Sequence, residues 1–240
     1  MNNRWWEYYT IRYFVGSVVG AGVVLFLNYS DTSPYSGSLT SLVNLKDSAF
    51  LGISLVAAIG FAFCYLASAP MLTFHATRMH MRIPDHRMKS WLLLCVLLVF
   101  FTVGIALIKL PVIPALLVGI ILAAQIYLIV HAGISQCKEI EKFYRKLAVA
   151  RINGESSSSE KYIAAVPEYV TSYRHLREHA NAYLIIVFEA ILAYTLYSLE
   201  TKSDGFVLMV IWVFPPCTVW GIASVLEARF ADDPSFENNG

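Results

Sequence analysis

Residues 172–199 read SYRHLREHANAYLIIVFEAILAYTLYSL, and this stretch decides what kind of fold the chain can adopt. It opens with a polar turn and continues as an apolar run about as long as a membrane is thick. A single carboxylate, Glu189, interrupts that run. An ionisable group at such a depth costs on the order of 3 kcal/mol on insertion scales, so its presence calls for a structural or functional reason.

The composition of the whole chain is that of a membrane protein. Of its 240 residues, 57% are hydrophobic and only 15% are charged, whereas soluble proteins average about 25% charged residues. A soluble fold could not bury this much apolar surface and still cover itself with polar groups. The net charge is +1, and acidic residues alternate with the basic ones in 138–177, so no nucleic-acid partner is expected.

Six apolar runs approach the length of roughly 20 residues that a membrane span requires. We therefore predict an all-α membrane protein, a bundle of six transmembrane helices with a small cytoplasmic helical layer. Four spans belong to an N-terminal transmembrane region, residues 1–131, and two to a C-terminal transmembrane hairpin, residues 182–226. The predicted spans are residues 11–27, 50–72, 91–108, 112–131, 182–199 and 206–226.

The polar segments outside the spans differ in length and in expected structure. Residues 28–49 are rich in Ser and Thr and are expected to form one exposed loop. Residues 132–181 are predicted to be a cytoplasmic helical segment, interrupted by a flexible linker at 153–161 with a run of serines. Residues 227–240 are predicted to be a disordered acidic tail.

The basic residues set the expected orientation. If the N-terminus is cytoplasmic, only Lys46, Lys109 and Lys202 of the eighteen Lys and Arg residues fall outside. Cytoplasmic loops carry the excess of basic residues in membrane proteins. We therefore expect a multi-pass protein of the inner (plasma) membrane with both termini in the cytoplasm, and the lipid bilayer as its first partner.

A docking surface is predicted in the cytoplasmic segment. Ile140, Phe143, Tyr144 and Leu147 share one helical face, and charged residues occupy the other face. Such a face can pack on membrane-proximal helices of the same chain, or it can bind a soluble cytoplasmic protein.

The first span carries small residues that allow close approach of another helix. Gly16 and Gly20 form a G-x-x-x-G pair, and Gly22 follows. Two interpretations stay open at this point: packing within the chain, and a seam between copies in a homo-oligomer.

Glu189 and Gln125 are the polar side chains of interest inside the spans. Glu189 shares a helical stripe with Ala182 and Ala193, and these small residues indicate that it faces another helix and not lipid. Gln125, in the fourth span, is its natural candidate partner, about 6 Å nearer the cytoplasm by the helical rise. Glu189 is then either a protonated packing acid or part of a proton or cation pathway.

The histidines all fall on the predicted cytoplasmic side. They are His75, His80, His86, His131, His175 and His179. Their H-x4-H and H-x3-H spacings at helix ends resemble those of membrane-bound di-iron hydroxylases and desaturases, and the resemblance implies a metal site made by these residues. That family also uses adjacent His–His pairs, which this chain lacks. We therefore interpret the histidines as interfacial groups and expect no cofactor.

The sequence lacks the enzyme motifs G-x-x-x-x-G-K-[ST], G-x-S-x-G and H-E-x-x-H, and it lacks the T-V-G-Y-G filter of potassium channels. Cys64, Cys95, Cys137 and Cys217 form no C-x-x-C pair and are interpreted as small buried hydrophobic residues.

We expect a non-enzymatic anchor, sensor or effector subunit of a bacterial multi-protein system, with stress or phage defence as one setting. The alternatives are an oligomeric ion or proton channel or small transporter that uses Glu189, and a histidine-box membrane metalloenzyme.

Overall fold

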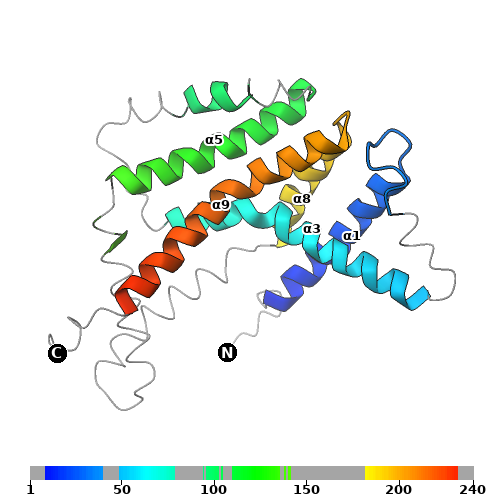
Figure 1. Cartoon of the computed structure of the whole chain (residues 1–240), viewed down its shortest axis with the longest axis horizontal. Helices are drawn as coiled ribbons and strands as arrows, with labels where there is room; N and C mark the ends of the chain where they lie inside the picture. Colours follow the sequence, from blue (N-terminus) through cyan, green and yellow to red (C-terminus); the bar gives the residue numbers. More distant parts are fainter. Residues whose placement is uncertain are drawn as a thin grey trace, which may run out of the picture.

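The computed structural model describes a chain that is helical throughout its regular parts. The described residues are 9–39, 49–78, 94, 96–102, 104, 110–135, 138, 140–141 and 182–231. Among them there is no strand, which agrees with the predicted all-α class. The main helices, shown in Figure 1, are α1 (Tyr9–Tyr29), α3 (Ala49–Arg78), α5 (Val112–Ser135), α8 (Ala182–Tyr197) and α9 (Lys202–Ala231).

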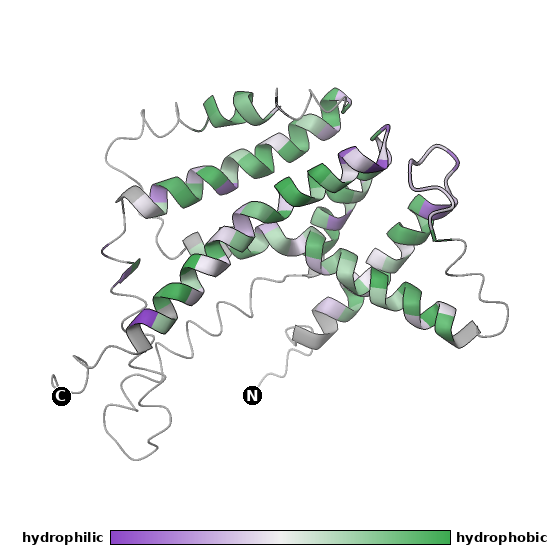
Figure 2. Ribbon diagram, in the orientation of Figure 1, coloured by the Kyte–Doolittle hydropathy of each residue, from purple (hydrophilic) through white to green (hydrophobic). Residues whose placement is uncertain are grey.

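Three of these helices are long and apolar enough to cross a membrane. The candidate spans are Leu51–Phe74 in α3, Val112–Gly133 in α5 and Lys202–Leu226 in α9. α1 and α8 hold shorter apolar stretches, Tyr13–Tyr29 and Leu184–Tyr197. Hydrophobic residues run along all five helices, and hydrophilic residues gather in the loop after α1 and in the turn between α8 and α9 (Figure 2). This is a membrane-associated helical protein.

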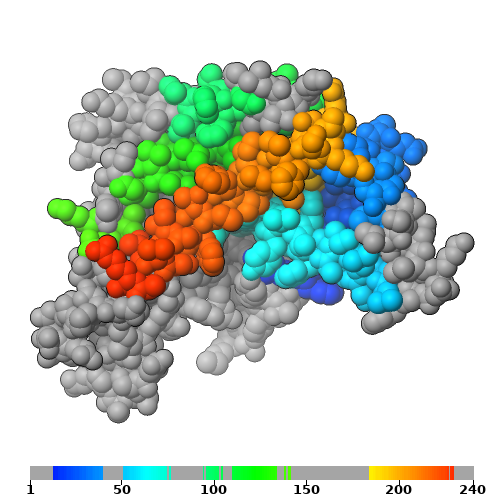
Figure 3. Space-filling view, in the orientation of Figure 1, coloured from blue at the N-terminus to red at the C-terminus, as the bar shows by residue number. Residues whose placement is uncertain are grey.

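Large apolar side chains cover the outside of the bundle as well as its core. Phe206 is 73% exposed, Phe14 68% and Trp220 64%. A helix that is apolar on all its faces is typical of a membrane span, and a soluble monomer avoids such extensive apolar surface. In the space-filling view, α9 lies across one face of the molecule between α5 and α3 (Figure 3).

The helix boundaries differ from the predicted spans mainly at the C-terminal ends of α3 and α9. α3 continues through Pro70 to Arg78, beyond the predicted end at residue 72. α9 continues to Ala231 and so includes the first residues of the stretch predicted as a disordered tail. α3 can continue past Pro70 because the indole of the buried Trp212 donates a hydrogen bond to the carbonyl that the proline leaves without a helical donor. α9 can continue because residues 227–231 still form helical hydrogen bonds to the preceding turn.

The third predicted span and the predicted cytoplasmic segment are among those described only in part. In the third predicted span, residues 94, 96–102 and 104 are helical, and Thr102 packs on Gly119 of α5. In the predicted cytoplasmic segment, the structure describes the end of α5, residue 138 and residues 140–141. The predicted linker at 153–161 lies outside the described residues.

α1 and α3 cross with their backbones in direct contact (Figure 1). A Cβ atom at Gly20 would lie 2.5 Å from the carbonyl oxygen of Gly60, and one at Gly60 would lie 2.5 Å from the backbone nitrogen of Ala21. A real Cβ does not come this close to backbone atoms, so the crossing requires glycine at both positions. Small residues therefore set the distance between these two helices.

Pro70 explains a second interhelical contact. A proline has no N–H, so the carbonyl of Leu66, four residues earlier in α3, loses its helical donor. Trp212 of α9 donates its Nε1–H to this carbonyl at 3.1 Å and to that of Ala67 at 3.2 Å. Trp212 is fully buried, and a buried indole N–H needs an acceptor. The two groups satisfy each other and connect α9 to α3.

Aromatic packing brings α8 to the same point. The ring of Phe188 meets Trp212 edge-on, with centroids 6.1 Å apart and planes at 73°. Phe188 also stacks with Phe74 of α3, with ring centroids 6.2 Å apart. Aromatic pairs at these distances contribute about 0.5–1.5 kcal/mol beyond the area that they bury. α3, α8 and α9 therefore share one aromatic core.

The loop after α1 folds back over the bundle. The main-chain oxygen of Asn28 accepts a hydrogen bond from the N–H of Gly37 at 2.9 Å, and its side-chain oxygen accepts one from the N–H of Leu39 at 2.7 Å. The hydroxyls of Thr32 and Tyr197 are 2.5 Å apart. The first part of the predicted loop at 28–49 thus keeps several exposed residues, as expected, but it is tied to α1 and α8 by these hydrogen bonds.

Candidate functional site

The buried face of α8 carries Glu189 into the bundle. Ile185, Phe188, Leu192 and Leu196 recur at intervals of three or four residues and are buried, as a helix with one inward face requires. Glu189 lies on the same face and is 0% exposed. Among the described residues it is the only Asp, Glu, Lys or Arg that is buried in this way. Glu189 therefore faces other helices and not lipid.

Glu189 lies against Gly16, at the point where α8 meets α1 and α3. A Cβ atom at Gly16 would lie 2.5 Å from Cys64 Sγ, 2.9 Å from Ile185 Cγ2 and 3.5 Å from Glu189 Oε1. The thiol, the methyl group and the carboxyl thus fill the space that a side chain at position 16 would occupy. We call Gly16, Cys64, Ile185 and Glu189 the Glu189 cluster.

The carboxyl group is sparsely hydrogen-bonded. Neither of its oxygens has a partner with standard hydrogen-bond geometry among the described residues. The polar group beside it is the Cys64 thiol, which is a weak donor. An isolated ionised carboxylate buried between helices would be very costly. The arrangement therefore suits a protonated acid or a carboxylate that binds a cation.

Gln125 does not pair with Glu189. Gln125 is 0% exposed in α5, and neither its Oε1 nor its Nε2 has a hydrogen bond within the part of the chain that the structure describes. The predicted partnership is therefore not formed. The reason is directional: α8 turns Glu189 toward Gly16 and Cys64, on α1 and α3, whereas Gln125 belongs to α5.

The predicted glycine set divides in two. Gly16 and Gly20 both lie at contacts within the chain, the first in the Glu189 cluster and the second at the α1–α3 crossing. A Cβ atom at Gly22 would have no described atom within 4 Å. The G-x-x-x-G pair is thus used for intramolecular packing, and Gly22 lies on an open face of α1.

The histidines are mostly beyond the part that the structure describes. His131, near the end of α5, is half-buried, and its ring lies 5.9 Å from that of Tyr127. His75 lies within α3, but its side chain is outside the described residues, as are His80, His86, His175 and His179. In the described residues, no group of three or more His, Cys, Asp and Glu side chains is placed to hold a metal ion.

The predicted docking surface is also described only at its start. Ile140 is helical and half-buried. Phe143, Tyr144 and Leu147 lie outside the described residues. The shared face of these four residues stays a prediction.

Comparison with known proteins found no match to this chain. The chain matches no family model, no curated protein and no solved structure. Its function has to be argued from its own residues.

Sequence reasoning missed the role of Cys64. The cysteine was expected to be a small buried hydrophobic residue, and it is buried, but it also provides the polar group beside Glu189. A signal was present in the sequence, because Gly60 and Cys64 repeat on α3 the four-residue spacing of Gly16 and Gly20 on α1. Cys217, in contrast, is exposed on α9, so the same expectation is wrong for that residue.

Proposed function

We propose that this chain is a non-enzymatic, multi-pass subunit of a bacterial multi-protein system, which anchors the system, senses a signal or acts on the membrane. It would cross the inner membrane six times with both termini in the cytoplasm. The observation that carries the proposal is the enclosure of Glu189. The acid is completely buried against Gly16 and Cys64 at a contact of three helices, which suits a packing role better than a catalytic one.

The cytoplasmic segment supplies the other half of the proposal. Its predicted amphipathic face, Ile140, Phe143, Tyr144 and Leu147, would bind a soluble partner, while the spans hold the protein in the bilayer. About fifty residues between α5 and α8 are enough for a docking platform but few for an independent catalytic domain.

A matched pair of substitutions tests the docking role. Phe143→Asp places a charge on the apolar face, and Lys142→Asp places the same side chain on the opposite face. The protein is purified in mild detergent, and co-purifying proteins are quantified by mass spectrometry. We expect a stoichiometric soluble partner with the wild type and with Lys142→Asp, and its loss with Phe143→Asp at equal membrane accumulation. Equal partner levels in all three proteins would refute the docking role.

One observation favours a second candidate, an oligomeric ion or proton channel or a small transporter. Both oxygens of Glu189 lack standard hydrogen bonds among the described residues, and an intramembrane acid of this kind can bind a proton or a cation. Since Gly16 and Gly20 are occupied within the chain, a homo-oligomer of this kind would associate through another face, such as that of Gly22.

Glu189→Gln separates the two candidates. The amide keeps the shape of the side chain but cannot titrate. If Glu189 is a neutral packing acid, Glu189→Gln should be nearly silent. Glu189→Leu would leave only the weak Cys64 donor without its acceptor, so it should change bundle stability by no more than about 1 kcal/mol. The measurements are unfolding in mixed micelles and proton or cation flux in proteoliposomes. A folded Glu189→Gln protein that loses a flux seen with the wild type would establish the channel or transporter.

A further inference from the structure

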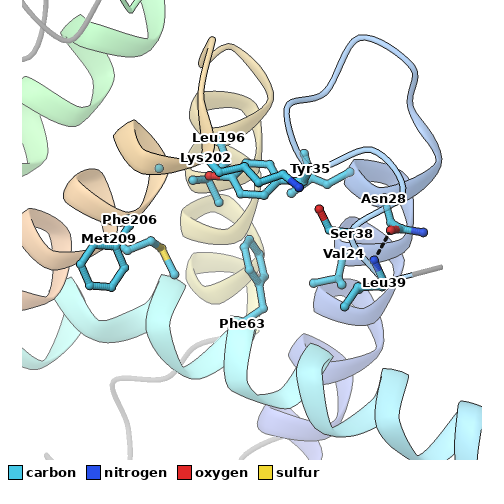
Figure 4. A pocket seen from close by; sticks show the side chains of 12 residues that line it. Val24, Asn28, Tyr35, Ser38, Leu39, Phe63, Leu196, Lys202, Phe206 and Met209 are labelled. Carbon is cyan, nitrogen blue, oxygen red and sulfur yellow. Dashed lines mark hydrogen bonds between the residues drawn. The ribbon is translucent and has the colours of Figure 1, made fainter. Parts of the chain in front are cut away.

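A cavity of about 340 Å³ lies at the end of the bundle where α1 and α8 finish and α9 begins. This volume falls within the range of roughly 300–1,000 Å³ that small-molecule sites occupy. Figure 4 shows Phe63 of α3 rising into the space between Val24 of α1 and Met209 of α9. Leu196 of α8 completes the wall. The interior is almost wholly apolar.

The loop after α1 covers the cavity and is fastened on both sides. The Asn28 side chain holds Leu39 from the α1 side, as the dashed line in Figure 4 shows. On the other side, the Tyr35 hydroxyl lies where a Cβ of Gly205 would be, so α9 needs glycine at that position for the loop to close. Gly37 supports the turn between them with a φ of 69°, a conformation that favours glycine.

Polar groups line the cavity only near this cover. Among the described residues that line the cavity, Lys202 is the one that carries a charge, and its side chain is exposed. Burial, and secondly the nearby carboxylate of Asp204, raise the pKa of Tyr35, so its phenol stays neutral. Asp204 itself accepts a hydrogen bond from the Thr201 hydroxyl at 2.6 Å. The rim of the cavity therefore holds the ammonium group of Lys202, with the carboxylate of Asp204 near Tyr35, above an apolar interior.

We infer that this cavity binds a single acyl chain that carries an anionic head group, with the chain among the four helices and the head beside Lys202. The apolar walls provide the hydrophobic part of the affinity. The ammonium group of Lys202 provides a point charge that pairs with a carboxylate or a phosphate. A free fatty acid and an anionic membrane lipid both have this chemistry.

Photolabelling of the full-length protein tests the assignment. The protein is placed in nanodiscs of phosphatidylcholine and exposed to dodecanoic acid with a diazirine on its chain, and the adducts are mapped by mass spectrometry. We expect saturable labelling of the peptides that contain Val24, Phe63 and Met209. Unlabelled dodecanoic acid should compete better than dodecanol, which has the same chain without the charge.

A second arm distinguishes the sources of the ligand. The same reactive chain is presented as lysophosphatidylglycerol, whose head group is an anionic phosphodiester. Stronger saturable labelling by the lipid assigns the site to a membrane lipid, and stronger labelling by the acid assigns it to a free fatty acid. The inference is overturned if neither probe labels the cavity saturably, or if Val18, on the outer face of α1, is labelled as strongly as Val24.

Two substitutions connect the labelling to the cavity. Val24→Trp fills the space, and we expect labelling to fall about tenfold or more; Val18→Trp is the matched control, because Val18 lies on the same helix and is 58% exposed. Lys202→Gln should abolish the advantage of the acid over the alcohol and leave labelling by a dodecanol probe intact. If the Val24→Trp protein does not accumulate, the Lys202→Gln protein alone tests the assignment. An unchanged preference for dodecanoic acid over dodecanol in that protein contradicts it.

Discussion

Trp212 donates its indole N–H to the main-chain oxygen of Leu66 at 3.1 Å, and this oxygen is available because Pro70 provides no helical donor. Trp212 and Leu66 are 146 positions apart in the sequence. A proline inside one helix and a buried tryptophan inside another each create a polar group without a partner. The hydrogen bond from the Trp212 indole to the Leu66 carbonyl satisfies both groups and joins α9 to α3.

Trp212→Phe should therefore lower the free energy of unfolding by about 1–3 kcal/mol, the usual cost of leaving a buried acceptor unsatisfied. Trp220→Phe is the matched control on the same helix, because Trp220 is exposed, and it should change stability little. The measurement is unfolding in mixed micelles, followed by circular dichroism.

The contribution of the hydrogen bond itself can be isolated in a double-mutant cycle with Pro70→Ala. Alanine restores the helical N–H, so the Leu66 carbonyl no longer depends on Trp212. The void that phenylalanine leaves is common to both backgrounds. Trp212→Phe should thus be milder in the Pro70→Ala protein, and an equal loss in both backgrounds would rule out this role of the indole.

The α1–α3 crossing predicts opposite effects for two neighbouring glycines. Gly20→Ala places a Cβ against the Gly60 carbonyl and should cost about 1–3 kcal/mol of unfolding free energy, because neither backbone can yield. Gly22→Ala meets nothing within 4 Å among the described residues. It should be neutral or stabilise the helix by up to about 1 kcal/mol. Gly22→Ala as damaging as Gly20→Ala would point instead to an interface between copies at Gly22.

The sequence predicts the class of the protein better than its contacts. The lengths of the apolar runs indicate helices that cross a membrane, and a period of 3.6 residues is enough to expect Glu189 to face its neighbours. The position of Glu189 beside Gly16 and Cys64 depends on how α1 crosses α3, and no local pattern fixes that crossing. Depth along the two helices favours Gln125 as the partner of Glu189, but depth does not determine which neighbouring helix each side chain faces.

The same distinction holds at the loop after α1. A run rich in Ser and Thr indicates a polar connection, but the hydrogen bond that ties the loop to α8 joins Thr32 and Tyr197, 165 residues apart. The cavity beneath it is made by four helices, so no single stretch of sequence could reveal it. The number of spans, their orientation and the docking surface stay predictions.

A metal analysis tests the histidine-box alternative. Six histidines without an adjacent His–His pair are too few for the ligand set of the di-iron family that they resemble. We expect no stoichiometric iron or zinc in the purified protein, and little effect of His175→Ala or His179→Ala on its accumulation. Iron near two atoms per chain, lost on either substitution, would support the metalloenzyme.

The central claim is a six-span protein whose termini and middle segment, 132–181, are cytoplasmic. Single cysteines are introduced at Ser36, Ser203 and Ser157 of a cysteine-free variant, and intact cells are treated with a membrane-impermeant thiol reagent. Ser36 and Ser203 are exposed at the end of the bundle where the loop after α1 meets the α8–α9 turn. We predict that cysteines at positions 36 and 203 react and that a cysteine at 157 does not react until the cells are opened. Reaction at position 157 in intact cells would contradict the account.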